Sequence, residues 1–180
     1  EMAQVREAVA RLAAGNGGLM VVEAEYGMGR TSLSEEAMKA AQRFGIMTTT
    51  GRNTASDQRA FEGYRESYQA LLDDSSGPTA LAIAFGKRQT GDATLEKWRV
   101  FSAFKELLER SGPHLMVLDD LDRGDRGSIE MTEYLVRNLV GQTKHPLLIL
   151  ITRGPAEAND PLHEVLDTHE TGVLAEHVRL

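Results

Sequence analysis

The chain has 180 residues, of which 41% are hydrophobic and 26% are charged, and it contains 17 glycines and no cysteine. This length and composition are typical of one globular domain with its own core, and they exclude a disordered chain, a disulfide framework and thiolate chemistry. With 20 Lys and Arg residues against 27 Asp and Glu residues, the formal net charge is −7. We therefore expect no direct binding of nucleic acid, because such binding requires clustered basic residues.

Apolar residues along the chain change repeatedly between helical spacing and short continuous runs. The helical spacing predicts helices over 2–12, 31–44, 61–72, 95–108, 129–140 and 162–166. The continuous runs predict strands over 19–22, 115–118 and 146–151. The β-branched stretch 46–50 predicts another strand, and a final strand over 173–180 completes the count. The segment 79–94 fits neither pattern and is left unassigned.

A long connection separates each predicted strand from the next. Because crossovers of about a dozen residues or more join parallel strands, we expect a five-stranded parallel sheet with helices on both faces, a three-layer α/β/α domain over residues 1–180. No apolar run approaches the roughly 20 residues that span a bilayer. We expect no membrane association, a cytoplasmic location, and a chain that is the core of a longer protein, because it starts without a translation-start pattern.

A glycine-containing loop follows the first predicted strand and opens the next helix, which is the position of a phosphate-binding loop. Its two glycines let backbone N–H groups converge on an anion, the helix N-terminus adds a positive dipole end, and the Thr31 hydroxyl can bind Mg²⁺. The predicted nucleotide-binding residues are Ala24, Glu25, Tyr26, Gly27, Met28, Gly29, Arg30, Thr31 and Ser32.

Two positions of this loop depart from the usual phosphate-loop pattern. Arg30 stands where a lysine normally reaches the phosphates, and Ala24 stands where a first glycine is usual. The planar guanidinium is bulkier than an ammonium group, so we expect phosphate binding and doubt fast hydrolysis. On these residues alone, a tight strand-to-helix turn explains the glycines equally well.

Polar residues also follow two later strands. Asp119 and Asp120 end the strand over 115–118, where one carboxylate can bind Mg²⁺ and the next can activate the attacking water. Thr152 and Arg153 end the strand over 146–151 and are predicted to sense the terminal phosphate. A solvated turn is the alternative for the aspartates, and an exposed turn is the alternative for Arg153.

Taken together, these motifs resemble the AAA/STAND-type P-loop NTPase module of signal-transduction ATPases with numerous domains, most closely that of the large ATP-binding regulators of the LuxR family. The similarity extends over nearly the whole chain. The segments that carry it are Glu1 to Leu12, Gly18 to Leu33, Gly51-Arg52, Phe61 to Glu66, Leu118 to Asp125 and Thr152-Arg153. Departures from the family pattern are Arg30 for lysine, Asp122 for histidine and Arg123 for tryptophan.

The resemblance implies a switch that holds ATP or ADP with Mg²⁺. It assigns Thr31 and Asp119 to Mg²⁺, Asp120 to water activation, and Thr152 or Arg153 to the terminal phosphate. It further implies lid and sensor domains or self-association, with DNA bound only through a helix-turn-helix domain outside these residues. Two alternatives stay open: an active ATPase or cyclase-linked module, and a pseudo-ATPase that serves as a protein interaction scaffold.

Overall fold

The computed structural model describes residues 1–54, 60–72, 93–140, 144–155, 162, 166 and 175–180. The helices are α1 (Met2–Ala13), α2 (Arg30–Arg43), α3 (Glu62–Leu72), α5 (Ala93–Arg110) and α6 (Arg126–Leu139), with a short 3₁₀ turn at Leu121–Arg123. The strands are β1 (Gly18–Glu23), β2 (Met47–Arg52), β3 (His114–Asp119), β4 (Leu147–Arg153) and β5 (Ala175–Arg179). Most of the unassigned segment 79–94 and of the predicted helix 162–166 lies outside the described residues.

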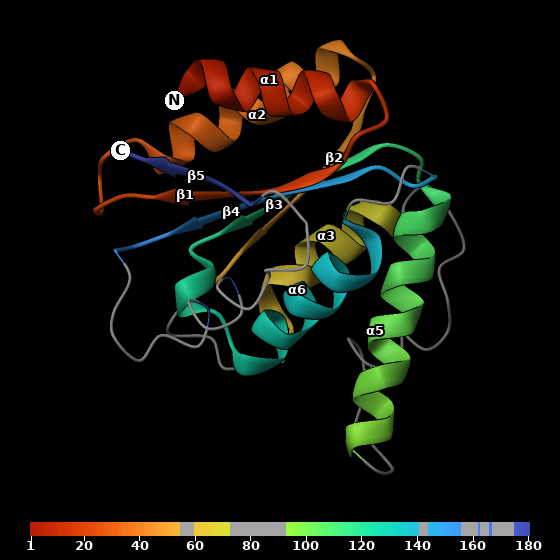
Figure 1. Ribbon diagram of the computed structural model, residues 1–180. Helices are drawn as coiled ribbons and strands as arrows, with labels where there is room; N and C mark the ends of the chain where they lie inside the picture. Colours follow the sequence, from red (N-terminus) through yellow and green to blue (C-terminus); the bar gives the residue numbers. More distant parts are fainter. Residues whose placement is uncertain (55–59, 73–92, 141–143, 156–161, 163–165, 167–174) are drawn as a thin grey trace.

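The five described strands form one sheet in the order β2-β3-β4-β1-β5, and every pairing is parallel (Figure 1). β1 and β4 are neighbours, and the chain runs from β1 to β2 at one edge of the sheet and from β4 to β5 at the opposite edge. A ligand crevice is expected where such connections diverge, beyond the carboxyl ends of the strands. The loop after β1 and the residues that end β3 and β4 all lie at this edge.

Helices cover both faces of the sheet, which confirms the predicted three-layer α/β/α fold. Figure 1 shows α1 and α2 on one face and α3, α5 and α6 on the other. Side chains alternate along each strand, so Leu115 and Val117 of β3 join the core under α1 and α2. Met116 and Leu118 join the larger core under the other three helices.

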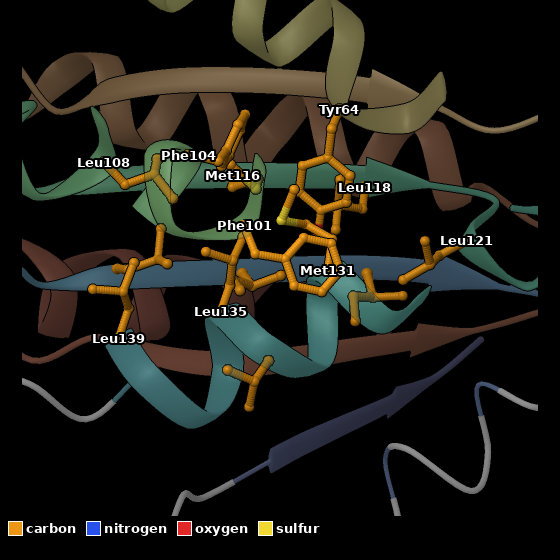
Figure 2. Close-up of a cluster of buried hydrophobic side chains, with 14 of the residues drawn as sticks. Tyr64, Phe101, Phe104, Leu108, Met116, Leu118, Leu121, Met131, Leu135 and Leu139 are labelled. Atoms are coloured by element: carbon orange, nitrogen blue, oxygen red, sulfur yellow. The ribbon is translucent and has the colours of Figure 1, made fainter. Parts of the chain in front are cut away.

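The larger core contains most of the buried aromatic side chains (Figure 2). Tyr64 of α3 and Phe104 of α5 meet edge to face, with ring centroids 5.2 Å apart. Burial of each large apolar side chain contributes about 2 kcal/mol. The core therefore holds β3 and β4 in place, and with them the polar residues at their ends. The labelled members on β3, α5 and α6 include Met116, Leu118, Phe101, Phe104, Met131 and Leu135.

Asp125 fixes the starts of two helices on this face. Its carboxylate accepts hydrogen bonds from the backbone N–H and the hydroxyl of Ser128, which caps α6. The same carboxylate accepts the backbone N–H groups of Phe61 and Glu62 at the start of α3. This cap explains why α6 begins at Arg126, three residues before the first apolar residue of the predicted helix.

Two strands are longer than the sequence predicts. β2 continues to Arg52 and β4 continues to Arg153, because ladder pairing with neighbouring strands extends the regular backbone into polar residues. This places Arg52 directly beside Asp119 in the sheet register. Among the described helices, none combines the length and apolar content that crossing a membrane requires.

Candidate functional site

The loop between β1 and α2 has the backbone of a phosphate-binding loop. Gly27 and Gly29 have φ angles of 88° and 94°, in the left-handed region that favours glycine. A Cβ atom at either position meets no heavy atom within 4 Å. The glycines are therefore required by backbone conformation and not by lack of space.

The start of α2 leaves donors free for an anion. The first helical hydrogen bond runs from the N–H of Leu33 to the carbonyl of Gly29. The N–H groups of Arg30, Thr31 and Ser32 precede it and have no acceptor within the helix. These groups and the helix dipole favour negative charge at this point.

Thr152 connects the two aspartates that follow β3. Its hydroxyl donates to Oδ1 of Asp119 at 2.5 Å and accepts the backbone N–H of Asp120 at 2.9 Å. Thr152 is fully buried, and Asp119 is 9% exposed. Asp120 has a φ of 51° and is thereby turned out of the strand. The hydroxyl thus holds one carboxylate and the backbone of the next residue.

Arg30 does not extend freely into the loop. Its Nη1 lies 2.9 Å from Oδ1 of Asp120, and the Arg30 side chain is only 8% exposed. The contact is an ion pair without the alignment of a hydrogen bond. Burial raises the pKa of the Asp120 carboxyl above its ordinary value, and the positive charge of Arg30 partly offsets that rise.

The carboxyl end of β2 adds residues that the sequence analysis did not assign to the site. Nη2 of Arg52 lies 3.5 Å from Oδ2 of Asp119. Asn53 is buried, and both its side-chain amide and its backbone N–H donate to the Asp119 carbonyl at 3.0 Å. A Cβ at Gly51 would lie 1.4 Å from the carbonyl oxygen of Gly63 in α3. Only glycine fits this close approach between β2 and α3.

These elements surround one pocket of about 660 Å³. This volume falls within the usual range for small-molecule sites. Arg123, on the 3₁₀ turn, also lines it, and its guanidinium lies over the ring of Tyr26 at 5.9 Å. The pocket is lined by Tyr26, Gly27, Gly29, Arg30, Thr31, Ser32, Arg52, Asn53, Thr54, Asp119, Asp120 and Arg123.

The AAA ATPase domain family matches residues 1–150 of the chain. The chain belongs to this family. It is therefore a P-loop NTPase with a nucleotide-binding AAA domain, and AAA ATPases bind ATP or ADP with Mg²⁺. No curated protein sequence matches it.

A solved structure with a TM-score above 0.5 has a similar fold. A chain of the HORMA:CdnC:Trip13 complex of E. coli MS115-1 is 14% identical, with a TM-score of 0.57 over 99% of this chain and 61% of that chain. This chain thus spans less than two thirds of the length of that chain. The DnaC helicase loader is 16% identical, with a TM-score of 0.48 over 98% of this chain and 86% of that chain.

Six of the nine predicted loop residues of the AAA domain line the pocket. Ala24, Glu25 and Met28 do not. Ala24 is buried below the loop, where its N–H donates to the Arg153 carbonyl at 3.2 Å. Glu25 supports the turn, since its carbonyl accepts the N–H of Met28 at 3.2 Å.

The predicted sensor pair of the AAA domain is divided between the two faces of the sheet. Thr152 lies behind Asp119, on the side of α2. Arg153 follows it in the strand and therefore belongs to the opposite face, with Ile151. It is buried, does not line the pocket, and its Nε donates to the Gly154 carbonyl at 3.1 Å. The Arg153 side chain therefore lies outside the pocket lining, and its role as a sensor of the terminal phosphate stays a prediction.

The residues present fit a nucleotide with Mg²⁺. The left-handed glycines and the unsatisfied N–H groups at the start of α2 form an anion cradle. Thr31 and Asp119, both in the lining, supply oxygen ligands of the kind that Mg²⁺ prefers. No cluster of three or more acidic or histidine side chains within the described part of the chain could hold a metal by itself. A Mg²⁺ site here accordingly needs phosphate oxygens and water to complete it.

Proposed function

We propose that this AAA domain is a switch that binds ATP or ADP with Mg²⁺ and hydrolyses ATP slowly or not at all. The observation that carries the proposal is the buried ion pair between Arg30 and Asp120. It joins a residue of the phosphate loop to the carboxylate that the sequence assigns to water activation. A domain in this state keeps a nucleotide cradle while its hydrolytic group is engaged.

Binding is supported by groups independent of Arg30. The N–H groups at the start of α2 and the loop backbone between Gly27 and Gly29 bind the phosphates. Thr31 and Asp119 hold Mg²⁺, which neutralises phosphate charge when bound. Thr152 keeps Asp119 oriented through its hydroxyl. Nucleotide affinity is therefore retained when the loop lysine is replaced.

Hydrolysis depends on Asp120, whose carboxylate must accept a hydrogen bond from the attacking water. Its Oδ1 is 2.9 Å from a guanidinium that cannot lose its charge. Arg30 offsets part of the rise in pKa that burial gives the Asp120 carboxylate, and it occupies one of the two carboxylate oxygens. This argument supports slow turnover.

The regulatory context rests on the sequence resemblance. We infer that the domain belongs to a LuxR-type cytoplasmic transcription regulator, in which nucleotide state controls self-association or neighbouring lid and sensor domains. DNA binding is assigned to another domain, because the net charge of −7 makes this one a poor partner for phosphates of nucleic acid.

Isothermal titration of ATP and ADP into the protein, with and without Mg²⁺, tests the binding claim. We expect saturable heat for both nucleotides and stronger ATP binding with Mg²⁺. Phosphate release is then measured on the same sample, and we expect little or none. Absence of binding by a folded sample, or rapid turnover, would contradict the proposal.

The ion pair also favours a second candidate, a pseudo-ATPase that acts as a protein interaction scaffold. In that case the ion pair between Arg30 and Asp120 stabilises the pocket in place of a bound nucleotide. The two candidates differ in the first experiment, because a scaffold of this kind binds neither ATP nor ADP.

A further inference from the structure

Three arginines and no lysine line the described pocket, and only one of them lies against the carboxylate expected to hold Mg²⁺. Arg30 is buried against Asp120, and Arg123 lies over the Tyr26 ring. Arg52 contacts Oδ2 of Asp119 at 3.5 Å and is 59% exposed. An ion pair so exposed to water is weak, so Arg52 can exchange it for another anion at low cost.

The two oxygens of Asp119 have different partners. Oδ1 accepts the buried Thr152 hydroxyl. Oδ2 is left for a cation, and that oxygen faces Arg52. A metal ion at Oδ2 therefore repels the guanidinium and competes with it for the same carboxylate.

The position of Arg52 relative to Asp119 is fixed by the backbone. The two residues are paired in the parallel ladder between β2 and β3. Asn53 donates twice to the Asp119 carbonyl, and the contact of Gly51 with Gly63 holds β2 against α3. A guanidinium displaced from Asp119 thus stays at the same edge of the pocket.

We propose that Arg52 reads the terminal phosphate of a bound nucleoside triphosphate, exchanging its ion pair with Asp119 for that phosphate when Mg²⁺ occupies Asp119. This inference rests on the proposed nucleotide binding. β2 is the edge strand of the sheet, one strand beyond Asp119 and furthest from the loop after β1 among the strands on that side. A phosphate chain that starts at the loop reaches Arg52 only with its last group. A diphosphate leaves Arg52 on Asp119.

The planar fork of arginine suits this role, because it binds phosphate oxygens through two parallel hydrogen bonds. Arg52 is thereby a specificity-determining residue for triphosphate over diphosphate. Its movement away from Asp119 also changes the contacts at the end of β2, the strand that packs on α3.

The test measures the affinities of the β,γ-imido analogue of ATP and of ADP for the wild-type protein, Arg52→Gln and Arg52→Lys, each in Mg²⁺ and in EDTA. In Mg²⁺ we expect Arg52→Gln to lower the affinity for the triphosphate analogue by about tenfold, and the affinity for ADP to change by less than about twofold. Arg52→Lys should restore part of the lost affinity. In EDTA we expect the substitution to have little effect on either nucleotide.

Arg110→Gln is the matched control, since Arg110 is an exposed arginine on α5 outside the pocket. Thermal unfolding verifies that each variant is folded. Equal losses for both nucleotides, an equal loss in EDTA, or no loss at all would overturn the role of Arg52. If the wild-type protein binds neither nucleotide, the proposed function fails, and the inference fails with it.

Discussion

Arg30 and Asp120 form an ion pair at 2.9 Å between the first residue of α2 and the residue that follows β3. The phosphate loop is thus tied to the carboxylate beside the expected metal position. Guanidinium and ammonium groups differ in reach and shape, so this contact depends on arginine. A variant that lacks this ion pair therefore distinguishes the two candidate functions, a restrained AAA ATPase and a pseudo-ATPase.

Arg30→Lys should shorten the cation and release Asp120. We expect affinity for ATP in Mg²⁺ to rise by up to about tenfold and phosphate release to become measurable, because the ammonium group can reach the phosphates. Titration calorimetry and a phosphate-release assay measure the two effects. Arg43→Lys, at the exposed end of the same helix, is the control. Unchanged affinity and turnover would show that Arg30 does not limit the site.

Gly29→Ala should strain the phosphate loop without creating a clash. A side chain in the left-handed region costs about 1–2 kcal/mol, and we expect the free energy of unfolding to fall by that amount. Nucleotide binding should weaken as the loop relaxes. Gly18→Ala is the control, because Gly18 has no left-handed φ and its added Cβ makes an ordinary contact at 3.8 Å with Leu148. Urea denaturation that gives equal stabilities for the two variants would refute this account.

Thr152→Val should remove the hydroxyl that connects Asp119 and Asp120 while keeping the side-chain shape. The buried Asp119 carboxylate and the partly buried N–H of Asp120 lose their partner, so we expect a loss of about 1–3 kcal/mol in the free energy of unfolding. The Mg²⁺ dependence of ATP binding should also weaken, because Asp119 is no longer oriented. Thr152→Ser keeps the hydroxyl and should retain both properties. The prediction is wrong if Val and Ser variants respond alike to Mg²⁺.

His114 should make stability depend on pH. Burial lowers the pKa of this histidine to about 4, and its Nε2 lies 2.8 Å from the Thr49 hydroxyl. In the unfolded chain this histidine has a pKa of about 6.5 and binds the proton more tightly than in the folded protein. The stability that comes from the neutral His114 is therefore present at neutral pH and is lost as pH falls from about 6.5 toward 4.

Between about pH 7 and pH 5 we expect this histidine to remove about 1–2 kcal/mol of stability. Urea denaturation of the wild-type protein and His114→Gln at both pH values measures it, and the variant should lose less. His177→Gln, at an exposed position of β5, should behave as the wild-type protein does. Identical pH dependence in the wild-type protein and His114→Gln would exclude the buried imidazole as its source.

Local patterns in the sequence were sufficient for the fold and for much of the site. Continuous apolar runs predicted β1, β3 and β4 because both faces of these strands are buried. Two glycines before a helix and two aspartates after a strand predicted the loop and the carboxylates. Each of these signals lies within a few neighbouring residues.

Contacts between distant segments could not be read in this way. Arg52 belongs to the pocket because the ladder places it beside Asp119, and no local pattern gives that register. Thr152 and Arg153 were predicted at the site together because they are the polar residues that end one strand. The alternation of side chains along β4, a signal available in the sequence, indicates that only one of the pair can face α2.

The sequence by itself determined the three-layer AAA core and the order of its phosphate loop and carboxylates, because hydrophobic period and backbone requirements are local properties. The tertiary structure alone decided which cation meets which carboxylate. Arg30 pairs with Asp120 and Arg52 with Asp119 because sheet order and helix packing bring their elements together. Charge pairing depends on distance in space, which spacing along the chain does not specify.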